Sequence, residues 1–595
     1  MIRRLACVAA AAGLLAGCAS VPRSSAPKVV EKLDQAGTPA EQSVLQDTRP
    51  GVGSTESQIV EGFITAQLAW QDGHQPARRF LTRRADARWH DDARMYVATG
   101  TPKVGAPEPG HVVPMTFTPA GIVNRDGSYL PAFGAAAGQV TWRLAMKKEN
   151  GEWRIDTPAD AVVLSRTQFE LFYQAYTLYF LDPSGGRLVP DRRYLPNDPG
   201  NLVDQLVRRL TDGPSDWLAP VASNDLAPPV SLNQVSTDRQ VVHVDLSGLN
   251  TQVIDDRLGA VAQLVWTVSQ LASVFGVQVT SDGQPVELRD VTSTVLGTTD
   301  LSRYDPDALP DTPVVGQRRP QPTRSGEPGD VQAGIQPYYV YGGAVYTLDG
   351  AQVLNGRYRL SSVGVSTDLQ QLAGVGPAAS GHGVTLWLGR MKGPLRPSSL
   401  SATGLSRPTW DRATGTFWTV ADGRNIRSVA LDGLVRPIRL DDGWLPRRLG
   451  TIGPLRLARD GTRVAFAAGP AGGQRLYVGR VHSTGDTITI ENPVPVTPAL
   501  ADVRDVAWES ASMLVVLGAP AGRRMAPWRV WADGSSTNPS PMPVPDVPGT
   551  VTITAAPDRP PVISSADGTL SINQGTWVAP RSGGKVRGSV PTYPG

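Results

Sequence analysis

A loose internal repeat in the last third of the chain constrains its fold more than any other sequence feature. The segment Val363–Ala373, two apolar stretches around a polar turn, recurs as Leu455–Ala465, and the offset of 455 − 363 = 92 residues is twice 46. Related units contain Trp410 and Trp508, and a weaker one contains Asp558. A period of about 45–50 residues with short strands is typical of β-propellers, in which each unit forms one blade.

Turn residues support the same fold. The chain contains 62 glycines and 52 prolines, which suits short strands joined by many turns. Asp-Gly pairs recur in the repeat region, among them Asp349-Gly350, Asp432-Gly433, Asp460-Gly461 and Asp533-Gly534. We therefore predict an all-β propeller over residues 335–595, with five units visible directly and a sixth or seventh left open. A β-sandwich with coincidental spacing is the alternative.

The first folded region combines helical and strand periodicity. The segment Thr55–Gln58 fits a capping box before an apolar helix, and a second short helix is predicted around Phe80 and Leu81. Strands are predicted over residues 95–99 and 112–118 and in a hairpin over 138–155. The sequence thus predicts a small α+β domain over residues 55–168. The ending Asn150-Gly151-Glu152-Trp153-Arg154-Ile155 resembles the last hairpin of NTF2-like domains.

A second α+β region follows over residues 169–300. Its predicted elements are a strand at 177–181, a helix from Asp198 or Asn201 to Leu210, a strand at 241–246, a helix at 257–275 and a strand at 277–279. The strand end Val244-Asp245-Leu246-Ser247 and the helical segment Ala262–Val268 are similar to the GerMN domain of bacterial envelope and spore-germination proteins. An unrelated α+β module with buried helices is the alternative.

Two other segments are too poor in large apolar residues to build a core. Residues 18–54 are rich in proline, serine and glycine, and we predict a disordered tether there. Residues 301–334 are rich in proline and are predicted to form a linker.

The N-terminus carries the pattern of an export signal. A basic start precedes an apolar run, and the run ends in Leu15-Ala16-Gly17-Cys18. This ending resembles a bacterial lipobox, which implies cleavage between Gly17 and Cys18 and removal of a signal peptide of residues 1–17. The resemblance makes Cys18 the lipidation site, with palmitate among the acyl groups. An ordinary secretory signal with a chance cysteine is the alternative.

Cysteine and charge counts limit the classes of function. Cys7 lies inside the signal, so the mature chain keeps Cys18 alone and cannot form an intrachain disulfide or a thiolate metal cluster. The whole sequence has 57 basic and 54 acidic residues, and removal of Arg3 and Arg4 leaves 55 basic residues. This small net charge provides no broad basic surface for nucleic acid, so membrane attachment is expected to come from the acyl chains.

No catalytic or metal-binding motif is found in the sequence. The six histidines are scattered without zinc-ligand spacing, and neither a Gly-x-Ser-x-Gly elbow nor a Walker A sequence occurs. The pairs Asp91-Asp92, Asp255-Asp256 and Asp441-Asp442 lack the spacing of a calcium loop and are expected to lie in solvated turns. We therefore predict no catalytic residue, no metal and no cofactor, and we do not expect an enzyme.

The order of these parts resembles one protein family. A lipobox, a tether, an α+β unit, a GerMN-like unit and a C-terminal propeller resemble the LpqB lipoproteins of actinobacteria over essentially the whole mature chain. The resemblance implies a lipid-anchored protein on the outer face of the cytoplasmic membrane. It also implies an accessory role to the MtrAB two-component system, through contact with the extracellular part of the sensor kinase MtrB, in cell envelope homeostasis and division. The family has no catalytic motif, so only Cys18 carries over as a functional residue.

The leading hypothesis is therefore a lipid-anchored, non-enzymatic interaction protein. Two alternatives stay open: a propeller lipoprotein that binds cell-wall glycan or a small molecule, and an enzyme with its site in the propeller channel. An aromatic-lined groove would favour glycan binding, and convergent polar residues in the channel would favour a ligand or an enzyme site. The sequence leaves open the number of blades, the partner-binding face, the direction of any effect on the kinase and the oligomeric state.

Overall fold

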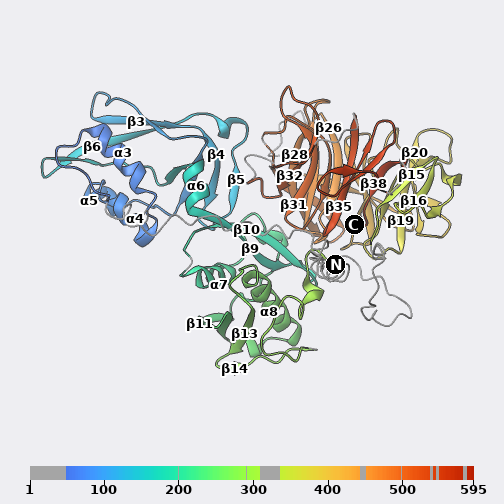
Figure 1. The fold of residues 1–595 in the computed structure, drawn as a ribbon, viewed down its shortest axis with the longest axis horizontal. Helices are drawn as coiled ribbons and strands as arrows, with labels where there is room; N and C mark the ends of the chain where they lie inside the picture. The colour runs from blue at the N-terminus through green and yellow to red at the C-terminus, as the bar shows by residue number, and fades with distance from the viewer. Residues whose placement is uncertain are drawn as a thin grey trace, which may run out of the picture. The chain divides into compact units, whose positions relative to one another are not determined.

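The computed structural model describes residues 48–595, apart from residues 199, 290, 309–334, 442–449, 498, 536–539, 544–548 and 581–585. The predicted signal peptide, the lipobox and most of the predicted tether lie outside the described residues. The described residues form a single folded unit. They form two α+β regions followed by a ring of β-sheets, which confirms the predicted fold class (Figure 1).

The first α+β region contains two four-stranded sheets, with strand orders β5-β4-β1-β8 and β2-β3-β6-β7. Its strands are β1 (Arg94–Ala98), β2 (Lys103–Val104), β3 (Val112–Phe117), β4 (Pro119–Asn124), β5 (Tyr129–Pro131), β6 (Val140–Glu149), β7 (Glu152–Ile155) and β8 (Val162–Ser165). Its helices are α3 (Glu56–Ala66), α4 (Gln71–Arg78), α5 (Arg83–Asp86), η1 (Gly134–Ala137) and α6 (Arg166–Phe172). Helices and sheets share one apolar core, which includes Phe63, Trp89 and Met115.

Local sequence signals explain the start of this region. Thr55 Oγ1 accepts a hydrogen bond from Gln58 N (3.3 Å) and Gln58 Oε1 accepts one from Thr55 N (2.9 Å), which confirms the capping box. The helix predicted around Phe80 and Leu81 is wrong in position, because α4 ends before Phe80. Both side chains are buried, and the segment instead pairs with the end of β7, where Ile155 N donates to Phe80 O (2.9 Å).

The strands predicted in this region are confirmed as β1, β3 and the β6–β7 hairpin. At the hairpin turn Asn150 and Gly151 adopt φ values of 52° and 85°. Two successive residues with positive φ are what a type I′ turn requires, and Asn-Gly meets this requirement at the lowest steric cost.

The second α+β region is built from six strands and two α-helices, which share one core. Its strands are β9 (Tyr173–Leu181), β10 (Leu188–Pro196), β11 (Ser231–Asp238), β12 (Val241–Ser247), β13 (Gly276–Ser281) and β14 (Gln284–Pro285). Its helices are α7 (Leu202–Asp212), η2 (Ala219–Val221), η3 (Leu249–Thr251), α8 (Ile254–Val268) and η4 (Ser302–Tyr304). The strands β12 and β13 pair in parallel, and α8 makes the crossover between them.

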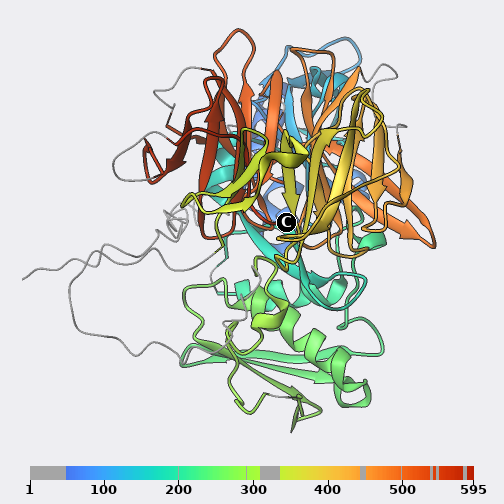
Figure 2. The same ribbon diagram turned by 90° about the vertical axis from the view of Figure 1, so that its right-hand side faces the viewer.

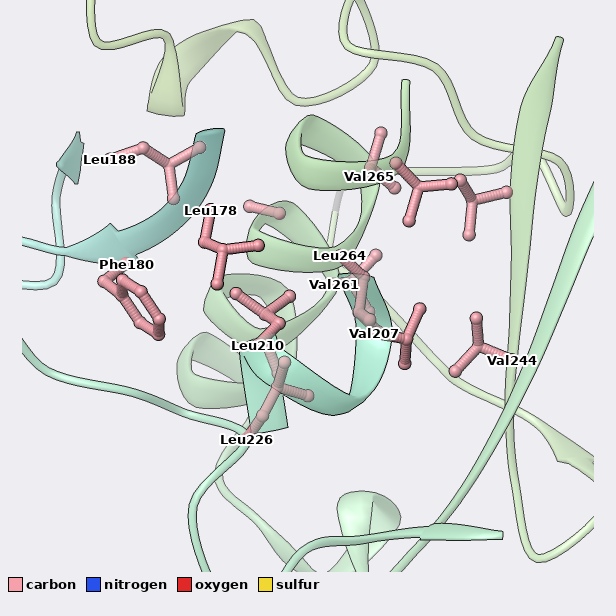
Figure 3. Packing of buried hydrophobic residues seen from close by; sticks show 14 of the residues in the cluster. Leu178, Phe180, Leu188, Val207, Leu210, Leu226, Val244, Val261, Leu264 and Val265 are labelled. Atoms are coloured by element: carbon pink, nitrogen blue, oxygen red, sulfur yellow. The ribbon is translucent and has the colours of Figure 1, made fainter. Parts of the chain in front are cut away.

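The core of the second region lies between its helices and its strands (Figure 3). Leu210 of α7, Val261 and Leu264 of α8, Phe180 of β9 and Val244 of β12 are all at most 1% exposed. Burial of a side chain of this size stabilises the fold by about 1.5–3 kcal/mol, so this packing holds α8 across the strands. Leu301 and Tyr304, at the start of the predicted linker, belong to the same core and are each 1% exposed.

Two predictions for the second region need correction. The helix predicted at 257–275 runs from Ile254 to Val268 instead, because the chain must turn to enter β13 in parallel with β12. Leu271 and Val274 lie in the turns after the end of this helix and still pack against the core. Their burial explains why the helical spacing of apolar residues continues past Val268. The strand β10 is absent from the prediction because Asp191, Arg192 and Arg193 interrupt its apolar alternation.

The propeller contains six four-stranded units among the described residues, so the structure supplies the blade number that the sequence left open. Blade 1 consists of β15 (Tyr338–Tyr341), β16 (Ala344–Thr347), β17 (Gln352–Leu354) and β38 (Ser589–Thr592), with η5 (Gly356–Tyr358) leading on to blade 2. Blade 2 consists of β18 (Ser362–Val365), β19 (Gln371–Pro377), β20 (Val384–Arg390) and β21 (Arg396–Pro397), and blade 3 of β22 (Thr409–Asp411), β23 (Thr416–Ala421), β24 (Asn425–Val429) and β25 (Val435–Leu440). Blade 4 consists of β26 (Thr451–Leu457), β27 (Arg463–Gly469), β28 (Arg475–Thr484) and β29 (Thr487–Pro495). Blade 5 consists of β30 (Asp502–Trp508), β31 (Met513–Ala519), β32 (Ala526–Trp531) and β33 (Ser540–Pro541), and blade 6 of β34 (Thr550–Ala556), β35 (Arg559–Ser565), β36 (Leu570–Asn573) and β37 (Trp577–Val578).

The innermost strands close the ring. Each of β18, β22, β26, β30, β34 and β38 contacts the next, and β38 contacts β18. The closing strand β38 pairs antiparallel with β15, so the first blade is completed by the last strand. Figure 2 shows the C-terminus among the blades. The five units found in the sequence correspond to blades 2 to 6, since each repeat covers the first two strands of a blade or the turn between them.

Burial between blades explains why a single repeat cannot fold alone. Trp418 is fully buried in a cluster shared by blades 3 and 4, and Trp508 is 5% exposed in a cluster shared by blades 4 and 5. Trp410 is 8% exposed between blades 2 and 3. Each blade therefore covers the apolar face of its neighbour.

One pair of neighbouring blades is joined differently. The outer strand β25 of blade 3 pairs in parallel with the outer strand β29 of blade 4, from Ile438 opposite Ile488 to Leu440 opposite Ile490. Blades 3 and 4 thus form one eight-stranded sheet.

Candidate functional site

The innermost strands of the propeller enclose a small cavity, which we call the axial cavity. Its volume is about 30 Å³, and its walls come from blade 1 and from blades 3 to 6. The ionisable side chains that line it are Arg407, Arg456, Arg459 and Tyr593. Three guanidinium groups thus converge where the five blades meet.

A single carboxylate bridges two of these arginines. Arg407 Nη2 lies 3.1 and 3.0 Å from the two carboxylate oxygens of Asp505, and Arg456 Nη2 lies 3.4 Å from Asp505 Oδ1. The exposed fractions of the side chains are 6% for Arg407, 11% for Arg456 and 5% for Asp505. Asp505 also accepts hydrogen bonds from Val506 N (3.0 Å) and Ile553 N (2.9 Å). Two buried cations therefore share one buried anion.

Arg407 and Arg456 also donate to main-chain oxygens. Arg407 Nη1 donates to Pro591 O (2.5 Å) and Nη2 to Ile553 O (3.0 Å). Arg456 Nη1 donates to Leu455 O (2.5 Å) and to Arg407 O (3.3 Å). Neutral acceptors satisfy these donors but do not balance their charge. Burial and the like charge of Arg407 lower the pKa of Arg456 to about 9, although Asp505 opposes the shift.

Arg459 lies beside this group. Its Nη2 donates to Pro594 O (2.7 Å), and its Nε is buried without a hydrogen-bond partner among the described residues. Burial lowers the pKa of Arg459 to about 10, Asp307 opposes this shift and Arg187 adds to it. Asp307 accepts a hydrogen bond from Ala511 N (2.6 Å), and burial raises its pKa to about 6.

The repeat places these residues at equivalent positions. Arg407, Arg456, Asp505 and Thr554 follow one another at intervals of 49 residues, since 456 − 407, 505 − 456 and 554 − 505 are all 49. Each lies just before or within the innermost strand of successive blades. The sequence prediction missed these residues because it examined motifs and not the polar positions of the repeat. Charged residues at the same position of successive units were the available signal.

A second group of contacts joins the propeller to strand β10 and to Trp217, which follows α7. The Arg192 guanidinium carbon lies 3.6 Å from the ring centroid of Trp531, and Arg192 Nε lies 3.5 Å from Asp533 Oδ2. Trp217 Nε1 donates to Asn492 O (2.9 Å), and Arg480 Nη1 donates to Trp217 O (2.9 Å). The charged residues that interrupt the pattern of β10 thus serve in packing against other elements.

An open groove of about 390 Å³ lies in the first α+β region. Its walls include the start of α3 and the turn of the β6–β7 hairpin. His111 Nδ1 lies 2.6 Å from Glu56 Oε1, and the ring of His111 lies 4.7 Å from that of Trp153. Lys148 Nζ lies 5.0 Å from the ring centroid of Trp153. The groove therefore combines one half-buried aromatic ring with charged side chains of both signs.

The predicted site residues Leu15, Ala16, Gly17 and Cys18 lie outside the described residues. Among the residues that the structure describes, no group of three or more His, Cys, Asp or Glu side chains is placed to hold a metal ion. Where the structure describes the aspartate pairs, they lie beside basic side chains: Asp91 contacts His74 (2.8 Å), Asp92 lies 3.0 Å from Arg125 and Asp255 lies 3.6 Å from Arg289. Asp255 and Asp256 begin helix α8 and do not lie in the predicted solvated turn, and Asp442 lies outside the described residues. In the part of the chain that the structure covers, no helix is long and apolar enough to cross a membrane.

Comparison with known proteins agrees with this architecture. Family models match three segments: the lipoprotein LpqB N-terminal domain at residues 49–170, the sporulation and spore germination domain at 177–287, and the lipoprotein LpqB β-propeller domain at 338–594. Lipoprotein LpqB of Thermobifida fusca is 28% identical in an alignment that covers 98% of this chain and 97% of that protein. Lipoprotein LpqB of Mycolicibacterium smegmatis is 28% identical over 76% of each chain. The first GerMN domain of the sporulation protein GerM from Bacillus subtilis is 21% identical with a TM-score of 0.18, over 21% of this chain and 94% of that chain.

The fold and the matched domains define a multidomain lipoprotein class with a GerMN-like domain and a C-terminal β-propeller. Both ends of the folded part match models built on the same family, and a relative of that family aligns over nearly the full length. The chain belongs to the LpqB lipoprotein family.

Proposed function

We propose that this chain is a lipid-anchored, non-enzymatic accessory protein that binds the extracellular part of the sensor kinase MtrB and modulates the MtrAB system. In this proposal the signal peptide is cleaved before Cys18, Cys18 is acylated, and the folded part lies on the outer face of the cytoplasmic membrane. The observation that carries the proposal is membership of the LpqB family, which rests on the matched N-terminal and propeller domains and on a relative that aligns over nearly the full length.

The charged centre of the propeller favours binding over catalysis. The ionisable side chains that line it are three arginines and one tyrosine, and arginine stays protonated and cannot act as a general base at neutral pH. The buried Asp505 is occupied by four donor groups, from Arg407, Arg456 and two main-chain amides, so it is not free to take a proton from a substrate. Convergent polar residues in the channel thus support a structural or ligand-binding role.

The proposed mechanism depends on confinement. Two or more acyl chains hold a protein stably at a bilayer, and confinement beside a membrane kinase raises the effective concentration without any new contact. If the folded part binds one signalling state of the kinase better than the other, it shifts the equilibrium by the difference in binding free energy.

Membrane co-purification tests this proposal. The native chain, Cys18→Ala and Cys7→Ala would be expressed in an actinobacterial host, and bound proteins identified by mass spectrometry. We expect MtrB to co-purify with the native chain and with Cys7→Ala, because Cys7 lies in the signal, and to be depleted with Cys18→Ala. Equal recovery of MtrB with all three chains would contradict the role of the anchor, and its absence from all three would contradict the partner.

Cell-wall glycan is the second candidate partner, and the groove of the first α+β region favours it. A groove of about 390 Å³ with a tryptophan in its wall suits a sugar ring, which packs its apolar face on an aromatic side chain. We expect the full chain to sediment with purified cell walls and Trp153→Ala to do so less, while Trp577→Ala in blade 6 behaves as the native chain. Sedimentation that Trp153→Ala does not change would remove the groove from consideration.

A further inference from the structure

We propose that copies of this chain associate head to tail, through an acidic tip of the second α+β region of one copy and a basic face of the propeller of the next. The acidic tip is defined by Val253, Asp255, Asp256 and Asp282. The basic face is defined by Tyr341, Arg357, Arg359 and Arg587. This association depends neither on the kinase nor on the lipid anchor of the proposed function.

The near-neutral charge of the whole chain conceals a division between two of its parts. Residues 169–300 contain 8 basic and 16 acidic residues, a net charge of −8 with histidine neutral. Residues 335–595 contain 26 basic and 17 acidic residues, a net charge of +9. When two copies approach each other, like parts repel and unlike parts attract. The division therefore favours contact between the second α+β region of one copy and the propeller of another.

The acidic tip lies where β12 and β13 end and α8 begins. Gly248 N donates to Asp282 Oδ2 (3.3 Å), which joins the loop after β12 to the turn after β13. Val253 is 65% exposed, and the side chain of Asp255 is 62% exposed. Among the described residues, the other acids at this end are Asp225, Asp245 and Glu287, and the basic residues are Arg257 and Arg289. Carboxylates thus outnumber guanidiniums around one exposed apolar side chain.

The basic face lies at the end of the ring where the innermost strands begin. Tyr341 ends β15 and is 55% exposed. The turn after it packs against the segment before β18, since a Cβ at Gly343 would lie 2.8 Å from Arg359 Cα. Arg357, Arg359 and Arg587 are all exposed. The other exposed or half-buried charged residues described at this end include Arg424, Arg504, Arg523, Arg524, Asp422, Asp441, Asp502 and Asp567.

The second α+β region of the same copy contacts the opposite end of the ring. Ala511 N, in the turn after β30, donates to Asp307 Oδ1 (2.6 Å) in the segment that leaves this region. The 7 residues of β30 separate the two ends of the ring by about 23 Å. The basic face of one copy is therefore left for another molecule.

The two surfaces match in chemistry as well as in charge. Each presents one exposed apolar side chain among charges that are mostly of one sign. Specific interfaces combine an apolar centre with a polar rim, and a guanidinium can bind a carboxylate through two parallel hydrogen bonds. Val253 against Tyr341 would form the centre, and the arginines of the face would pair with the aspartates of the tip. Because tip and face are different surfaces, the contact is heterologous and leaves one of each unused.

Sedimentation equilibrium of the full chain in density-matched non-ionic detergent measures the association. We expect dimers and larger species at low salt that dissociate between about 20 and 300 mM salt, because the Debye length falls below about 8 Å. A chain that is monomeric at every salt and protein concentration would overturn the proposal.

Charge reversal locates the two surfaces. Asp255→Lys with Asp256→Lys reverses the tip, and Arg357→Glu with Arg359→Glu reverses the face. We expect each double variant alone to be monomeric, and an equimolar mixture to associate, because each tip then meets a face of opposite charge. Asp486→Lys, which reverses an exposed acid of blade 4, should associate as the native chain does. Self-association of either double variant at native strength, or a mixture that stays monomeric, would overturn the pairing.

A disulfide tests the apolar centre without reversing any charge. Val253→Cys chains mixed with Tyr341→Cys chains should form a mixed covalent dimer under mild oxidation. Val253→Cys chains mixed with Asp486→Cys chains are the control and should form much less. Equal yields of mixed dimer from the two mixtures would overturn the contact.

Anionic vesicles test the other occupant that a basic face could have. Full-length Cys18→Ala chains would be mixed with vesicles of phosphatidylcholine, with or without phosphatidylglycerol. We expect equal binding to both kinds of vesicle. A chain that stays monomeric, binds only the anionic vesicles and loses this binding with Arg357→Glu and Arg359→Glu would assign the face to a bilayer, and would overturn the second copy as its occupant.

Discussion

Asp505 should be the most costly single carboxylate to neutralise in the propeller. Asp505→Asn conserves volume but leaves the guanidiniums of Arg407 and Arg456 without their shared anion at exposed fractions of 6% and 11%. All four groups that contact the carboxylate of Asp505 are hydrogen-bond donors. Asparagine offers them only one acceptor oxygen, because its NH2 group is itself a donor and would face other donors. Removing one partner of a buried ion pair costs about 3–5 kcal/mol, and we expect a loss of this size.

Native-state hydrogen exchange measures this loss where it arises. A chain with several folded parts does not unfold in two states, so the opening free energy should be read from peptides of β26 and β30. Asp486→Asn is the control, because Asp486 is 88% exposed in a surface pair and should change stability by about 0–1 kcal/mol. A loss below about 1 kcal/mol for Asp505→Asn would refute the view that the bridge is essential.

Three further predictions concern the other elements. Burial and Asp256 raise the pKa of Asp225 from 3.8 to about 6, so the second α+β region should lose stability as pH rises from about 4 to about 6. Denaturation midpoints measured across this pH range should show the loss in the native chain, and Asp225→Asn should reduce it. A Cβ at Gly364 would lie 2.6 Å from Pro408 O between blades 2 and 3, so Gly364→Ala should lower the opening free energy of β18 peptides by about 1–3 kcal/mol in hydrogen exchange. A Cβ at Gly404 meets nothing within 4 Å, so Gly404→Ala should change it by no more than about 0.5 kcal/mol. Thr55→Ala removes the cap of α3 and should cost about 1 kcal/mol, seen as faster exchange in the first turn of that helix.

The fold was predictable wherever one signal acts within a short stretch. The capping box at Thr55, the Asn150-Gly151 turn and the apolar face of α8 each determine local geometry through a few neighbouring residues. The repeat period predicted the propeller because each blade buries the same kind of face against the next. The strand β10 was missed because Arg192 is held by Trp531 and Asp533, which are more than 300 residues away in sequence.

The candidate site was not predictable from the motifs examined. Arg407, Arg456 and Asp505 come from three blades and meet only after the ring closes. Each is an unremarkable charged residue in its own segment, and only the spacing of 49 residues relates them. Arg459 lies three residues after Arg456, and its burial follows from the chain end that packs beside it.

The parallel pairing of β25 with β29 makes the ring mechanically uneven. In an ordinary propeller each blade is held to its neighbours by side-chain packing, so any seam can widen by a small slide of one blade on the next. Main-chain hydrogen bonds across the outer rim of blades 3 and 4 resist such a slide. Thermal fluctuations in the distance between neighbouring blades should therefore be largest at the other blade–blade contacts. A partner or ligand that opens the propeller would separate blades other than the pair of blades 3 and 4.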